Sequence, residues 1–181
     1  VRNRERAAHI MTFVTRLIEA DALKPDTLKG ICEGQDAVIS ALGKSVSTFD
    51  FSQPGFEAVD LGGNTNVLAE ALSAGVKKFV YLSALGAAQL TQLTYFRVHH
   101  EFSERLIGSG IDYSIVQPTA IMSAFNDLLK LARRGMLVTI GKGDSLTNPI
   151  SEADLAKVCV DALDQSFALI PAGGQQVYSR H

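Results

Sequence analysis

The sequence predicts an α/β domain in which a mostly parallel sheet carries helices on both faces. Short apolar runs alternate along the chain with longer segments of helical periodicity. Three of the five runs have little internal polarity, which is typical of strands that are buried on both faces. Strands that alternate with helices imply right-handed crossovers, and therefore a mostly parallel sheet.

Size and composition fit a single domain over residues 1–181. The chain is 46% hydrophobic and 20% charged, with a net charge of −2, so it can bury a core and is not a disordered chain. A pI near 6.1 argues against a basic, nucleic-acid-binding face. No apolar run reaches the roughly 20 residues that span a bilayer, and the charged N-terminus lacks a secretion signal.

Cysteine usage points to a reduced compartment. Cys32 and Cys159 lie far apart in the sequence and resemble neither a disulfide framework nor a metal cluster. We therefore expect a cytoplasmic protein that uses no metal, nucleic acid or membrane. Its oligomeric state stays open.

The predicted strands are the five apolar runs Arg16–Asp21, Ala37–Leu42, Lys78–Ala84, Tyr113–Gln117 and Met136–Ile140. The helical pattern covers Asn3–Val14, Asp26–Cys32, Glu57–Ala74, Phe96–Ser109, Ser123–Arg134 and a last helix that follows Ser151. Pro25 favours the start of the second helix, and Ser151 is a suitable N-cap for the last one. The loops 44–55 and 86–94 are the longest irregular pieces, and such loops often cover a ligand.

Three strand ends carry residues that suit a ligand site. Ala41–Gly43, Ser83–Gly86 and Gln117–Thr119 each follow a predicted strand. Ligands of open parallel sheets bind beyond the carboxyl ends of the strands, so these junctions would line one crevice. Gly43 and Gly86 would let the backbone approach a ligand closely, although glycines also simply end strands.

In their order and spacing these segments resemble the NmrA-like atypical short-chain dehydrogenase/reductase family. The resemblance rests on AVISALG at Ala37–Gly43, GVKKFVYLSALG at Gly75–Gly86, the helix around Tyr95–Glu104, SGIDYSIVQPT at Ser109–Thr119 and NPISEADL at Asn148–Leu155. It covers almost the whole chain and implies a Rossmann-like domain that binds NADP or NAD. Some members of this family are reductases, and others are sensors or assembly factors.

One family element is missing from the sequence. The resemblance implies a first strand, a G-x-x-G-x-x-G turn and a helix that together hold the dinucleotide pyrophosphate. Every glycine pair here, including Gly62-Gly63 and Gly173-Gly174, fails that spacing. We therefore expect a Rossmann-like sheet without the first strand and its helix, in an internal piece of a longer chain.

The resemblance also implies catalytic residues. Tyr95 falls at the position of the family's tyrosine, which exchanges a proton with the substrate carbonyl. His99 falls at the position of the lysine that lowers the tyrosine pKa, and Ser83 falls near the serine that holds the substrate. Tyr95 and His99 share one helical face. Alternatively, Tyr95 only begins the helix, His99 packs under the cofactor, and Ser83 satisfies backbone groups.

The cofactor assignment follows from the same resemblance. It places Arg2 and Arg4 where an arginine accommodates the 2′-phosphate of NADP, so NADP is expected and NAD remains possible. It places Asp21 and Ala22 beside the adenine. The remaining cofactor-binding residues would be Ala41, Leu42, Gly43, Ser83, Ala84, His99, Pro118 and Thr119. The alternatives are that both arginines lie on a solvated helix start and that Asp21 is a turn or cap residue.

Three functional hypotheses follow. The first is an NADPH-dependent reductase of a small carbonyl, quinone or conjugated substrate. The second is a non-catalytic dinucleotide sensor that acts through a protein partner. The third is that the polypeptide binds nothing, because the phosphate-binding turn is absent.

Overall fold

A four-stranded parallel sheet forms the centre of the molecule. The computed structural model describes residues 1–5, 7–46, 52–136 and 145–179. The strands are β1 (Ala37–Ser40), β2 (Lys78–Leu82), β3 (Asp112–Pro118) and β4 (Ala168–Ala172), and they lie side by side in chain order. All three pairings are parallel, so the carboxyl ends of the strands share one edge. The predicted parallel α/β fold is confirmed.

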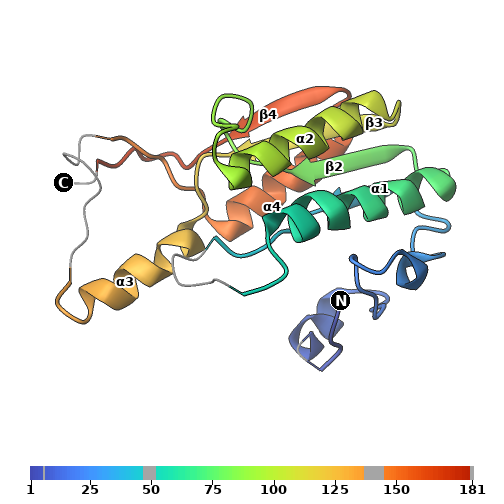
Figure 1. Cartoon of the computed structure of the whole chain (residues 1–181), viewed down its shortest axis with the longest axis horizontal. Coiled ribbons are helices and arrows are strands. Elements are labelled where there is room, and N and C mark those ends of the chain that lie inside the picture. The colour runs from blue at the N-terminus through green and yellow to red at the C-terminus, as the bar shows by residue number, and fades with distance from the viewer. Residues whose placement is uncertain (6, 47–51, 137–144, 180–181) are drawn as a thin grey trace.

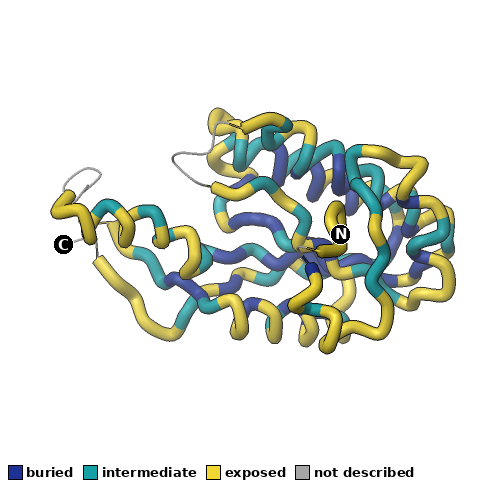
Figure 2. The backbone as a smooth tube through the Cα atoms, turned by 90° about the horizontal axis from the view of Figure 1, so that it is seen from below, coloured by how far each residue is buried: buried dark blue, intermediate teal, exposed yellow. Residues whose placement is uncertain are grey.

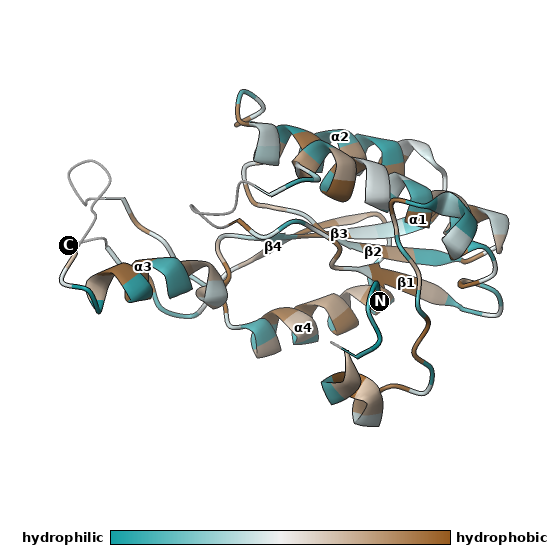
Figure 3. Cartoon of the chain, turned by 60° about the horizontal axis from the view of Figure 1, so that its bottom comes forward, coloured by the Kyte–Doolittle hydropathy of each residue, from teal (hydrophilic) through white to brown (hydrophobic). Residues whose placement is uncertain are grey.

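Helices cover both faces of this sheet. Helices α1 (Asn64–Ser73) and α2 (Thr94–Gly108) lie on one face, and α4 (Glu152–Asp161) lies on the other (Figure 3). Helix α3 (Asn126–Ala132) projects away from the sheet (Figure 1). In the part of the chain that the structure describes, no helix is long and apolar enough to cross a membrane.

The alternation of side chains along β2 explains the two cores. Phe79 and Tyr81 face α1 and α2, where they pack with Phe102 of α2. Val80 points to the other face, where it packs with Leu155 of α4. Successive side chains of a strand point to opposite faces, so one apolar run supplies both layers. Figure 2 shows the resulting buried residues along the strands and on the inner sides of the helices.

Shorter helices join these elements. They are the 3-10 helices Ala8–Phe13, Pro25–Leu28, Met122–Phe125 and Ala162–Asp164, and the π-helix Glu57–Gly63, which runs into α1. Ser151 caps α4 as predicted, because its hydroxyl accepts the backbone N–H of Asp154 at 3.1 Å.

Strand β4, which the sequence did not predict, pairs with β3 and is also anchored by a buried lysine. The Nζ of Lys78 donates to Asp112 Oδ1 at 3.1 Å and to Ser114 Oγ at 2.9 Å. It also donates to the carbonyl of Gln165, just before β4. More and less exposed residues alternate along β4, and Leu169 is 58% exposed. Its sequence therefore cannot be distinguished from that of a surface segment.

Two N-terminal predictions are wrong. The segment Arg16–Asp21 is extended but is not a strand of the sheet, because its backbone bonds go to Val1 and to Thr27. The predicted helix Asn3–Val14 is reduced to the 3-10 helix Ala8–Phe13, which buries none of its side chains. Isolated short helices without a buried face gain little stability. Most of the predicted strand Met136–Ile140 lies outside the described residues.

Candidate functional site

A cleft of about 720 Å³ opens at the carboxyl ends of β1, β2 and β3. Parallel strand ends and the first turns of α2 supply its walls. It is lined by these predicted residues: Ala41, Leu42, Gly43, Ser83, Ala84, Tyr95, His99, Pro118 and Thr119. The three strand junctions that the sequence singled out therefore meet in one place, because parallel pairing puts all of them at the same edge.

A second cleft of about 940 Å³ lies beside β1. Arg2, Asp21 and Ala22 line it, together with the segment Ala41–Gly43 that also lines the first cleft. The two clefts therefore meet at the end of β1. Arg4 lines neither cleft and is exposed.

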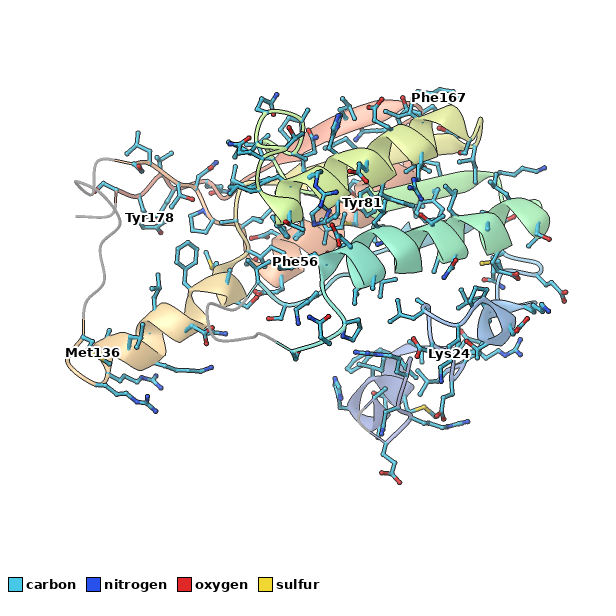
Figure 4. The ribbon with its side chains drawn as sticks, in the orientation of Figure 1. Lys24, Phe56, Tyr81, Met136, Phe167 and Tyr178 are labelled. Atoms are coloured by element: carbon cyan, nitrogen blue, oxygen red, sulfur yellow. The ribbon has the colours of Figure 1, made fainter. Side chains whose placement is uncertain are left out.

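His99 is directed into the protein. Its Nδ1 lies 2.6 Å from the hydroxyl of Tyr81, and its Nε2 lies 3.6 Å from Asp60 Oδ1. Tyr81, labelled in Figure 4, lies between the sheet and α2 and is fully buried. The Asp60 carboxylate beside Nε2 favours the tautomer with an Nε2–H, in which Nδ1 is an acceptor and the neutral Tyr81 hydroxyl donates to it. Both ring nitrogens therefore have protein groups beside them.

Burial governs the charges of this cluster. It raises the pKa of Asp60 to about 6 and lowers the pKa of His99 to about 4. Burial also raises the pKa of Tyr81, and the Asp60 charge raises it further. The imidazole is thus neutral wherever the Asp60 carboxyl is ionised, so their contact is not an ion pair.

Tyr95 lies above His99 in the cleft wall. Its ring centroid is 4.6 Å from the ring of His99 and 5.5 Å from that of Phe56, both edge-to-face. Burial, and secondarily the Asp60 charge, raises the pKa of Tyr95 to about 12. The phenol consequently keeps its proton at neutral pH and can act as a proton donor.

Asp60 fixes the backbone at the end of β1. Its Oδ2 accepts the N–H of Lys44 at 3.0 Å, and a Cβ on Gly43 would lie 2.9 Å from its Oδ1. Gly43 was expected to make room for a ligand, whereas in the structure it makes room for this carboxylate. Asn64 also holds the backbone after β1, since its Nδ2 donates to the carbonyls of Leu42 and Asp60 at 3.0 and 2.7 Å.

Sequence reasoning missed Asp60, Asn64 and Tyr81. All three are buried, and polar residues of that kind cannot be told from exposed ones by helical or strand spacing alone. The signal that could have found Asp60 and Asn64 is their spacing of four residues, which places an acid and an amide on the same side of the predicted helix.

Ser83 offers an unpaired polar atom to the cleft. Its Oγ is buried and has no hydrogen-bond partner within the described residues. A buried hydroxyl without a partner is unusual, and a polar ligand group would satisfy it. By contrast, the hydroxyl of Thr119 already donates to the carbonyl of Asn148 at 2.9 Å. Ser83 and the strand-end backbone thus fit a ligand with polar groups, such as a dinucleotide. The described residues contain no His, Cys, Asp and Glu group that could hold a metal ion.

Comparison with known proteins agrees with this geometry. The sequence profile of a family described as NAD(P)H-binding matches residues 1–166. The chain is 28% identical over 123 residues to the Photosystem II assembly factor Ycf39 of Synechocystis sp., an alignment covering 67% of this chain and 36% of that protein. It is 32% identical over 126 residues to the chloroplastic divinyl chlorophyllide a 8-vinyl-reductase of Cucumis sativus. This alignment covers 64% of this chain and 30% of that protein.

A solved structure shares the fold over nearly the whole chain. The NADPH-dependent quinone oxidoreductase QOR2 of Escherichia coli, complexed with NADPH, superposes with a TM-score of 0.76 at 21% identity. The match covers 99% of this chain and 60% of that enzyme. The alignments with the two curated relatives thus span about a third of the length of each.

Proposed function

This chain belongs to the NAD(P)H-binding family, in its NmrA-like, atypical short-chain dehydrogenase/reductase class, and we propose that its two connected clefts hold NADPH. The observation that carries the proposal is the shared segment Ala41–Gly43, at which both clefts meet beyond the carboxyl end of β1. An extended dinucleotide needs such a continuous path across strand ends.

The two clefts divide the cofactor between them in this proposal. The nicotinamide half would lie in the first cleft, beside Ser83 and the Pro118–Thr119 segment. The adenosine half would lie in the second cleft, beside Asp21 and Ala22. Arg2 lines that second cleft and would pair with the 2′-phosphate, which favours NADP over NAD.

The chemistry that fits the first cleft is reduction of a small carbonyl, quinone or conjugated substrate. A bound nicotinamide would supply the hydride. Tyr95, which is neutral at physiological pH, would donate the proton to the substrate oxygen. Ser83 would hold that oxygen with its unpaired hydroxyl. His99 would orient the Tyr95 ring through their edge-to-face contact.

A second candidate is a dinucleotide sensor that acts through a protein partner. It is favoured by the raised pKa of Tyr95 and by the neutral imidazole next to it, since the family's lysine would lower that pKa. A relative of this chain is itself an assembly factor.

Cofactor titration tests the binding step. Purified protein is titrated with NADPH and with NADH while the fluorescence of each cofactor is followed. We expect saturable binding with a preference for NADPH that weakens in Arg2→Ala. Ser83→Ala should lower turnover more than cofactor affinity, because its hydroxyl holds the substrate oxygen, whereas Ser73→Ala, an exposed serine of α1, should change neither. Absence of binding to both cofactors would contradict the proposal.

A turnover assay separates the two candidates. NADPH oxidation is measured across a panel of quinones and aldehydes for the wild type, Tyr95→Phe and Tyr113→Phe. Tyr113 lies in β3 and packs against Phe167, outside both cleft linings, so it is the matched control. A reductase loses turnover in Tyr95→Phe alone. Binding without turnover of any substrate supports the sensor.

A further inference from the structure

A buried polar chain links the core of the domain to the junction of the two clefts. It runs from the Tyr81 hydroxyl on β2, through the imidazole of His99 on α2, to the carboxyl of Asp60 in the π-helix. From Asp60 it continues to the Lys44 N–H, directly after Gly43. Each member is buried except the last, whose backbone borders the cleft.

This polar chain ends at the backbone that borders both clefts. Gly43 belongs to both cleft linings, and the Asp60 carboxylate lies where a Gly43 side chain would be. A hydrogen bond from a backbone N–H to an ionised carboxylate is stronger than one to a neutral carboxyl group. The backbone at the cleft junction is therefore held most firmly when Asp60 carries its charge.

We propose that Asp60 is a positioning residue for dinucleotide binding, whose ionised carboxylate, backed by His99 and Tyr81, holds the Gly43–Lys44 backbone in the binding conformation. This inference rests on the proposed cofactor site and adds a dependence of its affinity on the protonation of one buried acid. In this scheme Asp60 contacts neither the substrate nor the nicotinamide, and it acts through the Gly43–Lys44 backbone that it holds.

The charged and titratable groups facing Asp60 define the pH range of the effect. They are Lys44 on the loop after β1, His99 and Tyr95 on α2, and Tyr81 on β2. Both tyrosines and the imidazole stay neutral between pH 5 and 7.5, because burial raises the pKa of each phenol and lowers that of His99 to about 4. Burial raises the pKa of Asp60 to about 6, so in this range Asp60 is the member that changes charge.

The first test measures NADP⁺ affinity by calorimetry from pH 7.5 to pH 5. About one tenth of a carboxyl with a pKa near 6 is ionised at pH 5, so wild-type affinity should fall up to about tenfold. In Asp60→Asn the fall should be absent once the ligand's own titration, common to both proteins, is subtracted. Asp161→Asn, on the exposed end of α4, should keep the wild-type profile. An unchanged profile in Asp60→Asn overturns the proposal.

The second test needs neither a cofactor nor an Asp60 variant. Replacing His9, His100 and His181 by Asn leaves one imidazole, whose ¹⁵N shifts report its tautomer. We expect an Nε2–H tautomer whose resonances shift with a midpoint near pH 6 as Asp60 titrates. A failure of NADP⁺ to bind at any pH would remove the proposed function, whereas imidazole resonances that stay constant from pH 7.5 to 5 would overturn the Asp60–His99 coupling.

Discussion

Replacing Asp60 by Asn should change how the stability of the domain depends on pH. Burial raises the pKa of Asp60 from 3.8 to about 6, so the folded state binds a proton more tightly than the unfolded state does. Its contribution to stability is therefore full below pH 3.8 and is lost as the pH rises through 6. The difference of about 2.2 pKa units corresponds to roughly 3 kcal/mol lost by pH 7.

Urea denaturation of wild type and Asp60→Asn at several pH values measures this loss. Other titrating groups cancel in the difference between the two proteins, so the stability of the variant relative to wild type should rise by about 2.4 kcal/mol between pH 4 and 7, because the unfolded-state carboxyl is already partly ionised at pH 4. The matched Asp161→Asn change removes an exposed ion pair with Lys157 and should shift stability by less than about 1 kcal/mol. A difference between Asp60→Asn and wild type that stays flat with pH would refute the reasoning.

Three further variants test the surrounding contacts. Gly43→Ala should cost about 1–3 kcal/mol in urea denaturation, because its Cβ would meet Asp60 Oδ1 at 2.9 Å, whereas Gly108→Ala meets open space and should cost nothing. Tyr81→Phe should lower the free energy of unfolding by about 1–3 kcal/mol, because the buried Nδ1 of His99 loses its donor. Equal urea midpoints for Tyr81→Phe and wild type would contradict that hydrogen bond. Lys78→Met should lower the free energy of unfolding by about 1–3 kcal/mol, because it removes the ammonium that Asp112 and the Gln165 carbonyl share, and a loss below about 1 kcal/mol would contradict a role in anchoring β4.

The apolar runs around β2 and β3 sufficed to predict the centre of the sheet because helices cover both faces of these strands. β1 is an edge strand with Ile39 42% exposed, but its run is still apolar, and the parallel order places its end beside the other two. The helix Glu57–Ala74 was likewise predicted, although its first turns form a π-helix. Local periodicity carries this information because each of these segments contacts the core over most of its length.

The misses occur where stability comes from contacts distant in sequence. Strand β4 has an alternating, half-exposed pattern, and its place depends on its pairing with β3 and on Lys78, which lies 87 residues before Gln165. The segment Arg16–Asp21 has the composition of a strand, but a strand also needs a neighbour to complete its hydrogen bonds. The inward orientation of His99 depends on Tyr81 and Asp60, which the helical spacing of Tyr95 and His99 does not encode.

The orientation of His99 bears on the direction of any chemistry at this site. A lysine at this position would present a cation to the phenol of Tyr95 and favour its ionised form. Here the imidazole is neutral, its Nδ1 is engaged by Tyr81, and burial together with Asp60 raises the pKa of Tyr95 to about 12. A phenol with that pKa donates a proton to a developing alkoxide, but at neutral pH it does not accept one from an alcohol. The arrangement therefore suits carbonyl reduction over alcohol oxidation, and it suits dinucleotide binding without turnover equally well.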